Sequence, residues 1–322
     1  MKAIRVHETG GPERLQLDEL PDPTPGPGEL LIDVKAIGVN FIEIYQREGL
    51  YPLPRPFILG AEACGVVRAI GSGVQDFKHG DVVVSQSVKG AYAERAVVVA
   101  ERAVTVPNGV DPKLAAAVWL QGLTAHYLTT STHPLRMGER ALVHAAAGGV
   151  GLLLCQMAKK RGAFVIGTAS TDEKRALARE AGADEVIDYT TQDFAAETKR
   201  ITDNTGVEVV YDSVGKNTFD KSLDCLRRRG LLALFGQSSG PVPAVDPQIL
   251  NRKGSLFLTR PTLNDYVATR AELLSRAGDV LGWVARGELS VRIGLELPLS
   301  KAADAHRAIA ARQTTGKVLL VP

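Results

Sequence analysis

Cysteine is scarce in this sequence: Cys64, Cys155 and Cys225 are the only three in 322 residues, and they lie far apart. They form no CxxC pair, which argues against a structural zinc lobe and against a disulfide framework. Cys155 and Cys225 fall in helix-like stretches. We therefore interpret all three as small buried hydrophobic residues and not as catalytic thiols.

A strong charge of one sign is also missing, because 38 lysines and arginines face 36 aspartates and glutamates. This balance gives no field that would favour nucleic acid or an anionic membrane as a partner. No uninterrupted apolar run approaches the length of a membrane span, and residues 1–8 turn charged too early for a secretory signal. We expect a cytoplasmic protein with neither a membrane nor a nucleic acid partner.

What the sequence does contain changes along its length. Glycine and proline punctuate residues 1–120, where residues 21–28 can only be an extended loop. Short β-branched runs indicate a compact, mostly antiparallel β domain or partial barrel. These runs lie at residues 29–37, 65–70, 81–84 and 91–99, with a short helical turn at 38–49.

A helix expected at residues 111–127, with a break at 121–122, leads into a repeating pattern. Strands are expected at 139–144, 164–168, 185–188, 207–211, 231–235 and 255–259, and helices at 152–160, 171–181, 194–202 and 219–226. Strands that alternate with helices of this length pair in parallel through crossovers. The pattern therefore predicts a doubly wound α/β sheet.

The final segment is too short to be a domain of its own. It holds a long amphipathic helix at 269–286, a strand at 293–297, a helix at 301–312 and a strand at 318–321. We therefore expect these C-terminal elements to pack onto the N-terminal β domain. The expected domains are thus residues 1–123 with 261–322, split around residues 124–260.

The stretch that organises the chain is residues 142–151, Leu-Val-His-Ala-Ala-Ala-Gly-Gly-Val-Gly. A strand, a glycine-rich turn and a helix in this order let a phosphate approach the helix N-terminus. The spacing from Ala145 through Gly148 to Gly151 begins with alanine, so the turn is not a strict GxGxxG motif, although its strand–helix setting strengthens the match. The alternative is a close helix–strand crossing that binds no ligand.

The next strand distinguishes between dinucleotides. An NAD site places an acid at the end of this strand to bind the ribose 2′-hydroxyl. Here the strand ends in residues 167–171, Gly-Thr-Ala-Ser-Thr, followed by Lys174. Small hydroxyl groups and a cation suit a 2′-phosphate, so NADPH is expected, although Lys174 could simply lie on a solvated helix face. Later strand ends at Tyr189, Ser213 and residues 235–238 should also face the cofactor.

A possible reactive site lies in the β-rich part. Asn40 and Tyr45 stand on the short helical turn, with Tyr51 just beyond it. Polar and aromatic groups on a loop supported by a rigid scaffold can form a site. The alternative is ordinary turn chemistry for Asn40 and packing for the tyrosines, and the sequence alone favours this alternative.

Several motifs together resemble the zeta-crystallin-like NADPH:quinone oxidoreductases, which are zinc-free members of the medium-chain dehydrogenase/reductase superfamily. The motifs are residues 144–151, Tyr-Asp-Ser-Val-Gly at 211–215, residues 222–230, Gly-Val-Asn-Phe at 38–41, Gly-Ala-Glu at 60–62 and residues 254–261. The resemblance covers essentially the whole chain.

This resemblance implies a GroES-like catalytic domain split around a Rossmann domain, a homodimer, and bound NADPH. It also implies a set of cofactor-contacting residues. These are Asn40, Tyr45, Thr124, Ala147, Gly148, Gly149, Val150, Gly151, Ser170, Lys174, Tyr189, Ser213, Phe235, Gly236, Ser238, Arg260 and Lys317.

The resemblance also bears on metal. Zinc-dependent relatives carry Gly-His-Glu where this chain has Gly60, Ala61 and Glu62, so neither a catalytic nor a structural zinc is expected. A quinone accepts hydride without the Lewis acid that an alcohol substrate needs. We therefore expect an NADPH-dependent quinone reductase, with Asn40, Tyr45 and Tyr51 lining the reactive site. The alternatives are an enone or enoyl reductase, and a crystallin-like or nucleic-acid-binding protein that binds NADPH without turnover.

Overall fold

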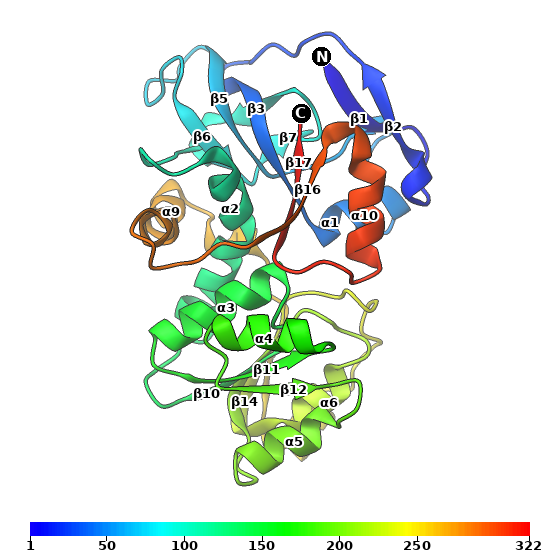
Figure 1. The fold of residues 1–322 in the computed structure, drawn as a ribbon, viewed down its shortest axis with the longest axis vertical. Coiled ribbons are helices and arrows are strands. Elements are labelled where there is room, and N and C mark those ends of the chain that lie inside the picture. Colours follow the sequence, from blue (N-terminus) through cyan, green and yellow to red (C-terminus); the bar gives the residue numbers. More distant parts are fainter. The chain divides into compact units, whose positions relative to one another are not determined.

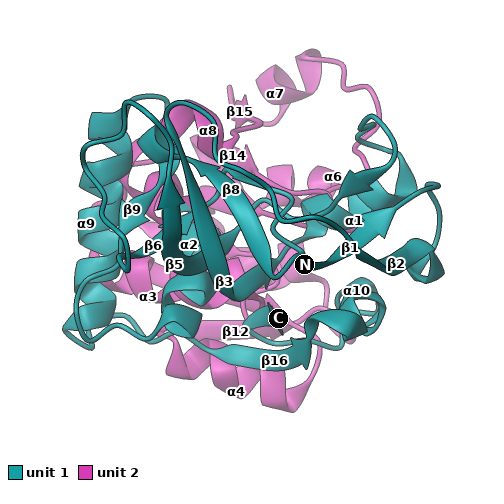
Figure 2. Cartoon of the chain, turned by 90° about the horizontal axis from the view of Figure 1, so that it is seen from above, with its two compact units in different colours: residues 1–123, 268–322 teal, residues 124–267 magenta.

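The computed structural model describes residues 1–322, which divide into two units. Unit 1 comprises Met1–Leu123 and Ala268–Pro322, and unit 2 comprises Thr124–Val267 (Figure 2). Unit 1 contains a curled, mostly antiparallel sheet, and unit 2 contains a parallel sheet with helices on both faces, so the predicted fold class is confirmed. None of the helices combines the length and apolar character that crossing a bilayer requires.

Strand β3 (Glu29–Val39) is the centre of unit 1. It pairs antiparallel with β5 (Ala63–Ile70) on one edge, and with β8 (Arg95–Val99) and then β17 (Lys317–Val321) on the other. The last strand of the chain thus completes a sheet that begins near residue 29. This pairing confirms that the C-terminal segment returns to the N-terminal β structure.

The other elements of unit 1 extend or cover these sheets. The strands are β1 (Lys2–Val6), β2 (Leu15–Glu19), β4 (Phe57–Ile58), β6 (Val82–Ser85), β7 (Val88–Lys89), β9 (Val104–Thr105) and β16 (Ile293–Pro298). The helices are α1 (Phe41–Glu48), α9 (Arg270–Ala285) and α10 (Ala302–Ala310), with α2 (Pro112–Tyr127) continuing into unit 2, and short 3₁₀ turns at Pro12–Arg14, Ala100–Arg102 and Leu299–Lys301.

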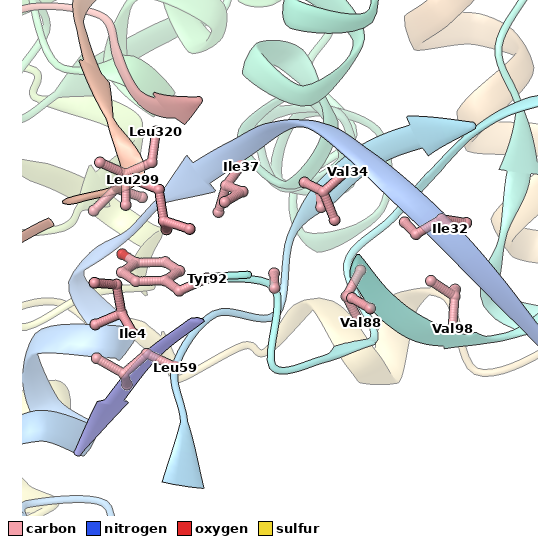
Figure 3. Close-up of a cluster of buried hydrophobic side chains, with 14 of the residues drawn as sticks. Ile4, Ile32, Val34, Ile37, Leu59, Val88, Tyr92, Val98, Leu299 and Leu320 are labelled. Carbon is pink, nitrogen blue, oxygen red and sulfur yellow. The ribbon is translucent and has the colours of Figure 1, made fainter. Parts of the chain in front are cut away.

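The core of unit 1 surrounds the buried ring of Tyr92. Figure 3 shows this ring among apolar side chains from separate segments, Ile4, Ile37, Leu59, Leu299 and Leu320. Burying such side chains supplies the main favourable term for folding.

A polar chain crosses the same core. The Arg47 guanidinium donates to His306 Nδ1 at 3.2 Å, so His306 Nε2 carries the ring proton and donates to the Tyr92 hydroxyl at 3.1 Å. Burial, followed by the nearby Arg47, lowers the pKa of His306 to about 3. A neutral histidine therefore joins α10 to α1 and to the Tyr92 segment.

Unit 2 is a six-stranded parallel sheet in the order β12-β11-β10-β13-β14-β15. The strands are β10 (Arg140–Val143), β11 (Phe164–Ala169), β12 (Glu185–Asp188), β13 (Val207–Asp212), β14 (Leu226–Leu234) and β15 (Phe257–Thr259). Helices α3 (Gly149–Lys160) and α4 (Asp172–Glu180) cover one face, and α5 (Phe194–Ile201) and α6 (Phe219–Asp224) cover the other (Figure 1). A π-helix (Leu128–Thr132), α7 (Gln248–Arg252) and α8 (Leu263–Tyr266) complete the unit.

The strand order places a topological switch point between β10 and β13. From β10 the chain proceeds to β11 and β12 on one side, and from β13 to β14 and β15 on the other. Ligands of doubly wound sheets bind beyond the carboxyl ends of the strands at such a point. The glycine-rich turn follows β10, so it lies at this position.

Two expected breaks are wrong. Helix α2 runs unbroken through Gln121 and Gly122. A Cβ at Gly122 would lie 2.8 Å from Val280 and 2.9 Å from Val118, so the residue is glycine because of packing and not because the helix breaks. This glycine permits close helix packing. Likewise, the helix expected at 219–226 ends at Asp224, and β14 already begins at Leu226. Arg229 lies within that strand at a left-handed φ of 59°, so β14 starts before residue 231, where the strand was expected to begin.

Two expected element starts also differ. Helix α3 begins at Gly149 and not at residue 152, so two glycines of the turn belong to the helix. The strand expected at 91–99 begins at Arg95, because residues before it bond to the first strand: Ile4 N–H donates to Tyr92 O and Glu94 N–H to Lys2 O. The β1–β2 ribbon was not anticipated.

All three cysteines are free and buried, which confirms that they are packing residues. Burial raises the pKa of each thiol to about 12, so the nucleophilic thiolate is suppressed.

Replacing His306 by alanine should destabilise unit 1 by about 2–4 kcal/mol, because buried Arg47 loses one of its acceptors and a cavity opens. Urea unfolding followed by tryptophan fluorescence reports on this unit, since Trp119 and Trp283 both belong to it. The control is Arg307→Ala at the neighbouring exposed position, expected within about 0.5 kcal/mol of wild type. Equal unfolding midpoints for the two variants would contradict this role.

Candidate functional site

The glycine-rich turn of unit 2 is a tightly packed structure. Ala145 adopts a left-handed φ of 51°, and Gly148 N–H donates to its carbonyl oxygen at 2.9 Å. A Cβ at Gly151 would lie 2.2 Å from the same oxygen, so only glycine allows α3 to start here. Ala145 therefore has a backbone conformation that glycine adopts at little cost, although the residue is alanine.

The turn leaves the N-terminus of α3 without a side-chain cap. Its N-cap is Gly148, whereas α4 is capped by Thr171 and α5 by Asp193. The first N–H groups of a helix need an acceptor, and the helix dipole favours an anion there. The start of α3 therefore suits a phosphate group.

The end of β11 carries hydroxyl groups and no acid. Ser170 is half-buried, and Thr171 Oγ1 accepts from Lys174 N–H at 3.2 Å, which places Lys174 in the first turn of α4. The neighbouring Arg175 is committed within the protein, because it forms ion pairs with Asp188, at 2.8 Å, and with Asp172.

The ends of β13 and β14 lie against each other. Phe235 N–H donates to Asp212 O at 2.9 Å, and Ser238 N–H donates to Ser213 O at 3.1 Å. A Cβ at Gly236 would lie 2.6 Å from Ser213 O, so this glycine also permits a close approach. The structure thus brings Ser213, Phe235, Gly236 and Ser238 together.

The other expected residues of unit 2 are more scattered. Ala147 and Thr124 are buried, while Gly148, Gly149 and Val150 are partly exposed. Tyr189 is 43% exposed at the end of β12, and exposed Arg260 donates to Pro261 O at 3.4 Å.

In unit 1, Asn40 caps helix α1 and lies in a buried polar cluster. Its Nδ2 donates to Glu62 Oε2 at 2.9 Å, and its Oδ1 accepts from Lys317 Nζ at 2.8 Å. Lys317 Nζ also lies 2.6 Å from Glu62 Oε2. Both ends of the Asn40 amide are therefore fixed in orientation.

The same cluster explains a motif of the sequence. A Cβ at Gly38 would lie 2.0 Å from Glu62 Oε2 and 2.8 Å from Lys317 Cε, so the ion pair lies directly over this glycine. Lys317 is only 1% exposed. Its ammonium group donates to Asn40 Oδ1 and to Glu62 Oε2.

Glu43 is the second acid of this buried cluster. Its Oε2 accepts from Asn40 N–H at 2.7 Å, and its Oε1 has no hydrogen-bond partner. Burial raises the pKa of Glu43 to about 7, against the opposing effect of the Lys317 ammonium group. The start of α1 thus holds a carboxyl group poised to titrate near neutral pH.

Two tyrosines lie together beside this cluster. The rings of Tyr45, on α1, and Tyr51 meet edge to face with centroids 5.5 Å apart, and the centroid of the Phe41 ring lies 6.3 Å from that of Tyr45. Tyr51 is 39% exposed. The structure therefore brings Asn40, Tyr45 and Tyr51 onto one short helix and the loop after it.

The residues present do not fit a zinc ion. Ala61 offers no ligand atom, and no group of three or more histidine, cysteine, aspartate or glutamate side chains is placed to hold a metal.

Sequence reasoning missed the buried partners of the expected residues. Glu43 and the ion pair of Glu62 with Lys317 were not anticipated, and neither was a buried chain from His144 to Asp212. One signal was available: Glu62 and His144 are polar residues within short runs of small apolar ones. Such residues are buried only when they are hydrogen-bonded.

Comparison with known proteins agrees with this architecture. The family model for alcohol dehydrogenase GroES-like domains matches residues 26–109, and that for zinc-binding dehydrogenases matches residues 149–273. A quinone oxidoreductase of Pseudomonas aeruginosa is 47% identical, covering 100% of this chain and 99% of that protein. The chain belongs to the quinone oxidoreductase family of the medium-chain dehydrogenase/reductases.

Two further proteins are similar to this chain over its whole length. The structure of Escherichia coli quinone oxidoreductase, complexed with NADPH, matches with a TM-score of 0.98 at 44% identity, covering 100% of both chains. A 2-haloacrylate reductase of Burkholderia is 41% identical, covering 99% of this chain and 98% of that protein.

Replacing Glu43 by glutamine should change how stability depends on pH. From about pH 4.5 to about pH 7 the unfolded wild-type chain releases the Glu43 proton while the folded protein keeps it, so wild-type stability falls as pH rises. The variant should gain about 3 kcal/mol relative to wild type across this window. Urea unfolding measured at several pH values tests this.

The control for this experiment is Glu48→Gln on the same helix, whose side chain is 50% exposed. The free energy of unfolding of Glu48→Gln should depend on pH in the same way as that of wild type. Parallel behaviour of Glu43→Gln would show instead that folding does not change the pKa of Glu43.

Proposed function

We propose that this protein is an NADPH-dependent quinone reductase that transfers hydride to a quinone without a metal ion. The observation that carries the proposal is the uncapped N-terminus of α3 at the switch point of the sheet, followed by a β11 end with hydroxyl groups and no acid. Membership of the quinone oxidoreductase family supports it, as do the NADPH complexes of its relatives.

The residues of unit 2 fit NADPH. A pyrophosphate would accept from the first N–H groups of α3, and Ser170 and Lys174 would bind a 2′-phosphate. The proposed contact set includes, in addition, Thr124, Ala147, Gly148, Gly149, Val150, Gly151, Tyr189, Ser213, Phe235, Gly236, Ser238 and Arg260. We also propose that residues 1–123 and 261–322 form the catalytic domain and residues 124–260 the cofactor domain.

Bound NADPH would supply the hydride, so the protein would position the cofactor and the acceptor and exclude water from the site. Tyr45 and Tyr51 would line the acceptor site with aromatic surface, and a hydroxyl group there could hydrogen-bond an acceptor oxygen. Asn40 would orient the reactants. Because Lys317 is buried against Asn40 and Glu62, we propose that it acts by fixing the Asn40 amide.

A second candidate is reduction of a conjugated carbon–carbon double bond. The 41% identical relative named 2-haloacrylate reductase favours it, because the same hydride step would serve both acceptors. A protein that binds NADPH without turnover is the remaining alternative.

Steady-state assays with 1,4-benzoquinone and with 2-alkenals should show NADPH oxidation with the quinone and a much lower kcat/KM with the alkenals. Single-turnover hydride transfer should slow at least roughly tenfold in Tyr45→Phe or Asn40→Ala, since each loses a positioning contact. If the alkenals react faster, the second candidate is correct. If neither variant slows transfer, the proposed roles are wrong.

Replacing Lys174 by alanine should raise the Kd for NADPH roughly tenfold or more and leave the Kd for NADH unchanged, because only NADPH carries the 2′-phosphate. Titration of both cofactors tests this. Lys199→Ala on the exposed face of α5 is the control and should bind both as wild type does. An equal loss for NADH would place Lys174 outside the 2′-phosphate site.

We further propose a homodimer that works in the cytoplasm, a compartment suited to three free thiols. Strand β15 supports the dimer, since it ends the parallel sheet, pairs only with β14, and exposes 61% of Phe257 and 37% of Leu258. An exposed apolar edge strand readily pairs with a second copy.

Light scattering of the wild-type chain should give twice the mass of one chain, and Phe257→Lys should shift it to the monomer. Glu185→Lys on β12, at the opposite edge of the sheet, is the control and should remain a dimer. A wild-type monomer, or a dimeric Phe257→Lys variant, would reject this interface.

A further inference from the structure

A buried hydrogen-bond chain crosses the carboxyl ends of the parallel strands in unit 2. Thr168 Oγ1 lies 3.1 Å from His144 Nδ1, His144 Nε2 lies 3.0 Å from Ser222 Oγ, and Ser222 Oγ donates to Asp212 Oδ2 at 2.9 Å. All four side chains are at most 2% exposed. The ring edge is also packed against Phe194, with centroids 4.8 Å apart.

The direction of every bond in this chain follows from counting protons. Asp212 accepts from the N–H groups of Val214 and Gly215, at 2.7 and 3.0 Å, and from the Thr218 hydroxyl at 2.7 Å, so it is an acceptor throughout. Ser222 spends its single proton on Asp212. It must therefore accept from His144 Nε2–H, which leaves Nδ1 to accept from Thr168.

The surroundings agree with a neutral ring. Burial lowers the pKa of His144, against the opposing effect of the Asp212 carboxylate. A protonated ring would carry a hydrogen on Nδ1 as well, and the Thr168 hydroxyl would then have to turn its own proton away.

The buried hydrogen-bond chain connects the carboxyl ends of strands β10, β11 and β13. His144 follows β10 directly before the glycine-rich turn, Thr168 lies two residues before Ser170, and Asp212 ends β13 and holds the Ser213–Gly215 turn. Ser222 lies on helix α6 and so joins that helix to the strand ends. These strand ends carry the three groups of residues proposed to hold NADPH.

We propose that His144, Ser222 and Thr168 are positioning residues that fix the carboxyl ends of β10, β11 and β13 for cofactor binding. This inference rests on the proposed function and adds residues that need not touch the cofactor. A purely structural role would affect thermal stability and leave the affinity of the folded protein unchanged. The positioning role affects affinity as well.

The first test is the tautomer of His144 in the full-length chain. Histidine-selective ¹⁵N NMR, with the resonance assigned by its loss in His144→Asn among the six histidines, should show a neutral ring protonated at Nε2. A ring protonated at Nδ1, or at both nitrogens, overturns the bond order.

The second test measures the Kd for NADPH well below the melting temperature. Thr168→Val keeps the shape of the side chain but removes the hydroxyl group that donates to His144 Nδ1. The Kd for NADPH should rise roughly tenfold, which is the effect expected for the loss of one hydrogen bond. Thr168→Ser keeps the hydroxyl group and should stay within about twofold. The matched control is Thr198→Val on α5, also fully buried but outside the chain, which should not change the Kd.

If Thr168→Val does not fold, Ser222→Ala tests the same link at its centre, with the same expected rise in Kd. Wild-type affinity in the folded variant overturns the positioning role. Failure of the wild-type chain to bind NADPH overturns the proposed function itself, which distinguishes the two failures.

Discussion

The close approach of helix α3 to the backbone of Ala145 is the constraint on which unit 2 depends. A Cβ at Gly151 would lie 2.2 Å from the Ala145 carbonyl oxygen, so the helix can begin here only with glycine. The consequence is an uncapped N-terminus at the switch point between β10 and β13. The packing requirement and the anion site are therefore the same feature, and the presence of glycine does not by itself reveal which purpose it serves.

Unit 1 also contains a buried ion pair, Glu62 with Lys317, in addition to its apolar core. Glu62 and Lys317 lie over Gly38 and hold the Asn40 amide. Glu62 directly precedes β5, and Lys317 begins β17, the strand by which the C-terminal segment pairs with β3. A buried ion pair adds little stability but fixes geometry when its hydrogen bonds are complete. The incomplete member is Glu43, which keeps one unpaired oxygen, and burial of its carboxyl group raises its pKa to about 7.

Much of the fold followed from sequence because the α/β repeat has strong periodicity, and β12 has the predicted bounds of Glu185–Asp188. Glycines misled where they served packing, as Gly122 did in α2. The candidate site was predictable only as a set of residues. Partners of Asn40 lie 22 and 277 residues away in the chain, and no local pattern encodes such contacts.

The central claim is that the carboxyl edge of the unit 2 sheet binds NADPH. A crystal structure of the full-length chain grown with NADPH tests this most directly. It should show the pyrophosphate on the N–H groups at the start of α3, with the 2′-phosphate beside Ser170 and Lys174. NADPH bound elsewhere, or phosphates without contact to α3, would contradict the claim.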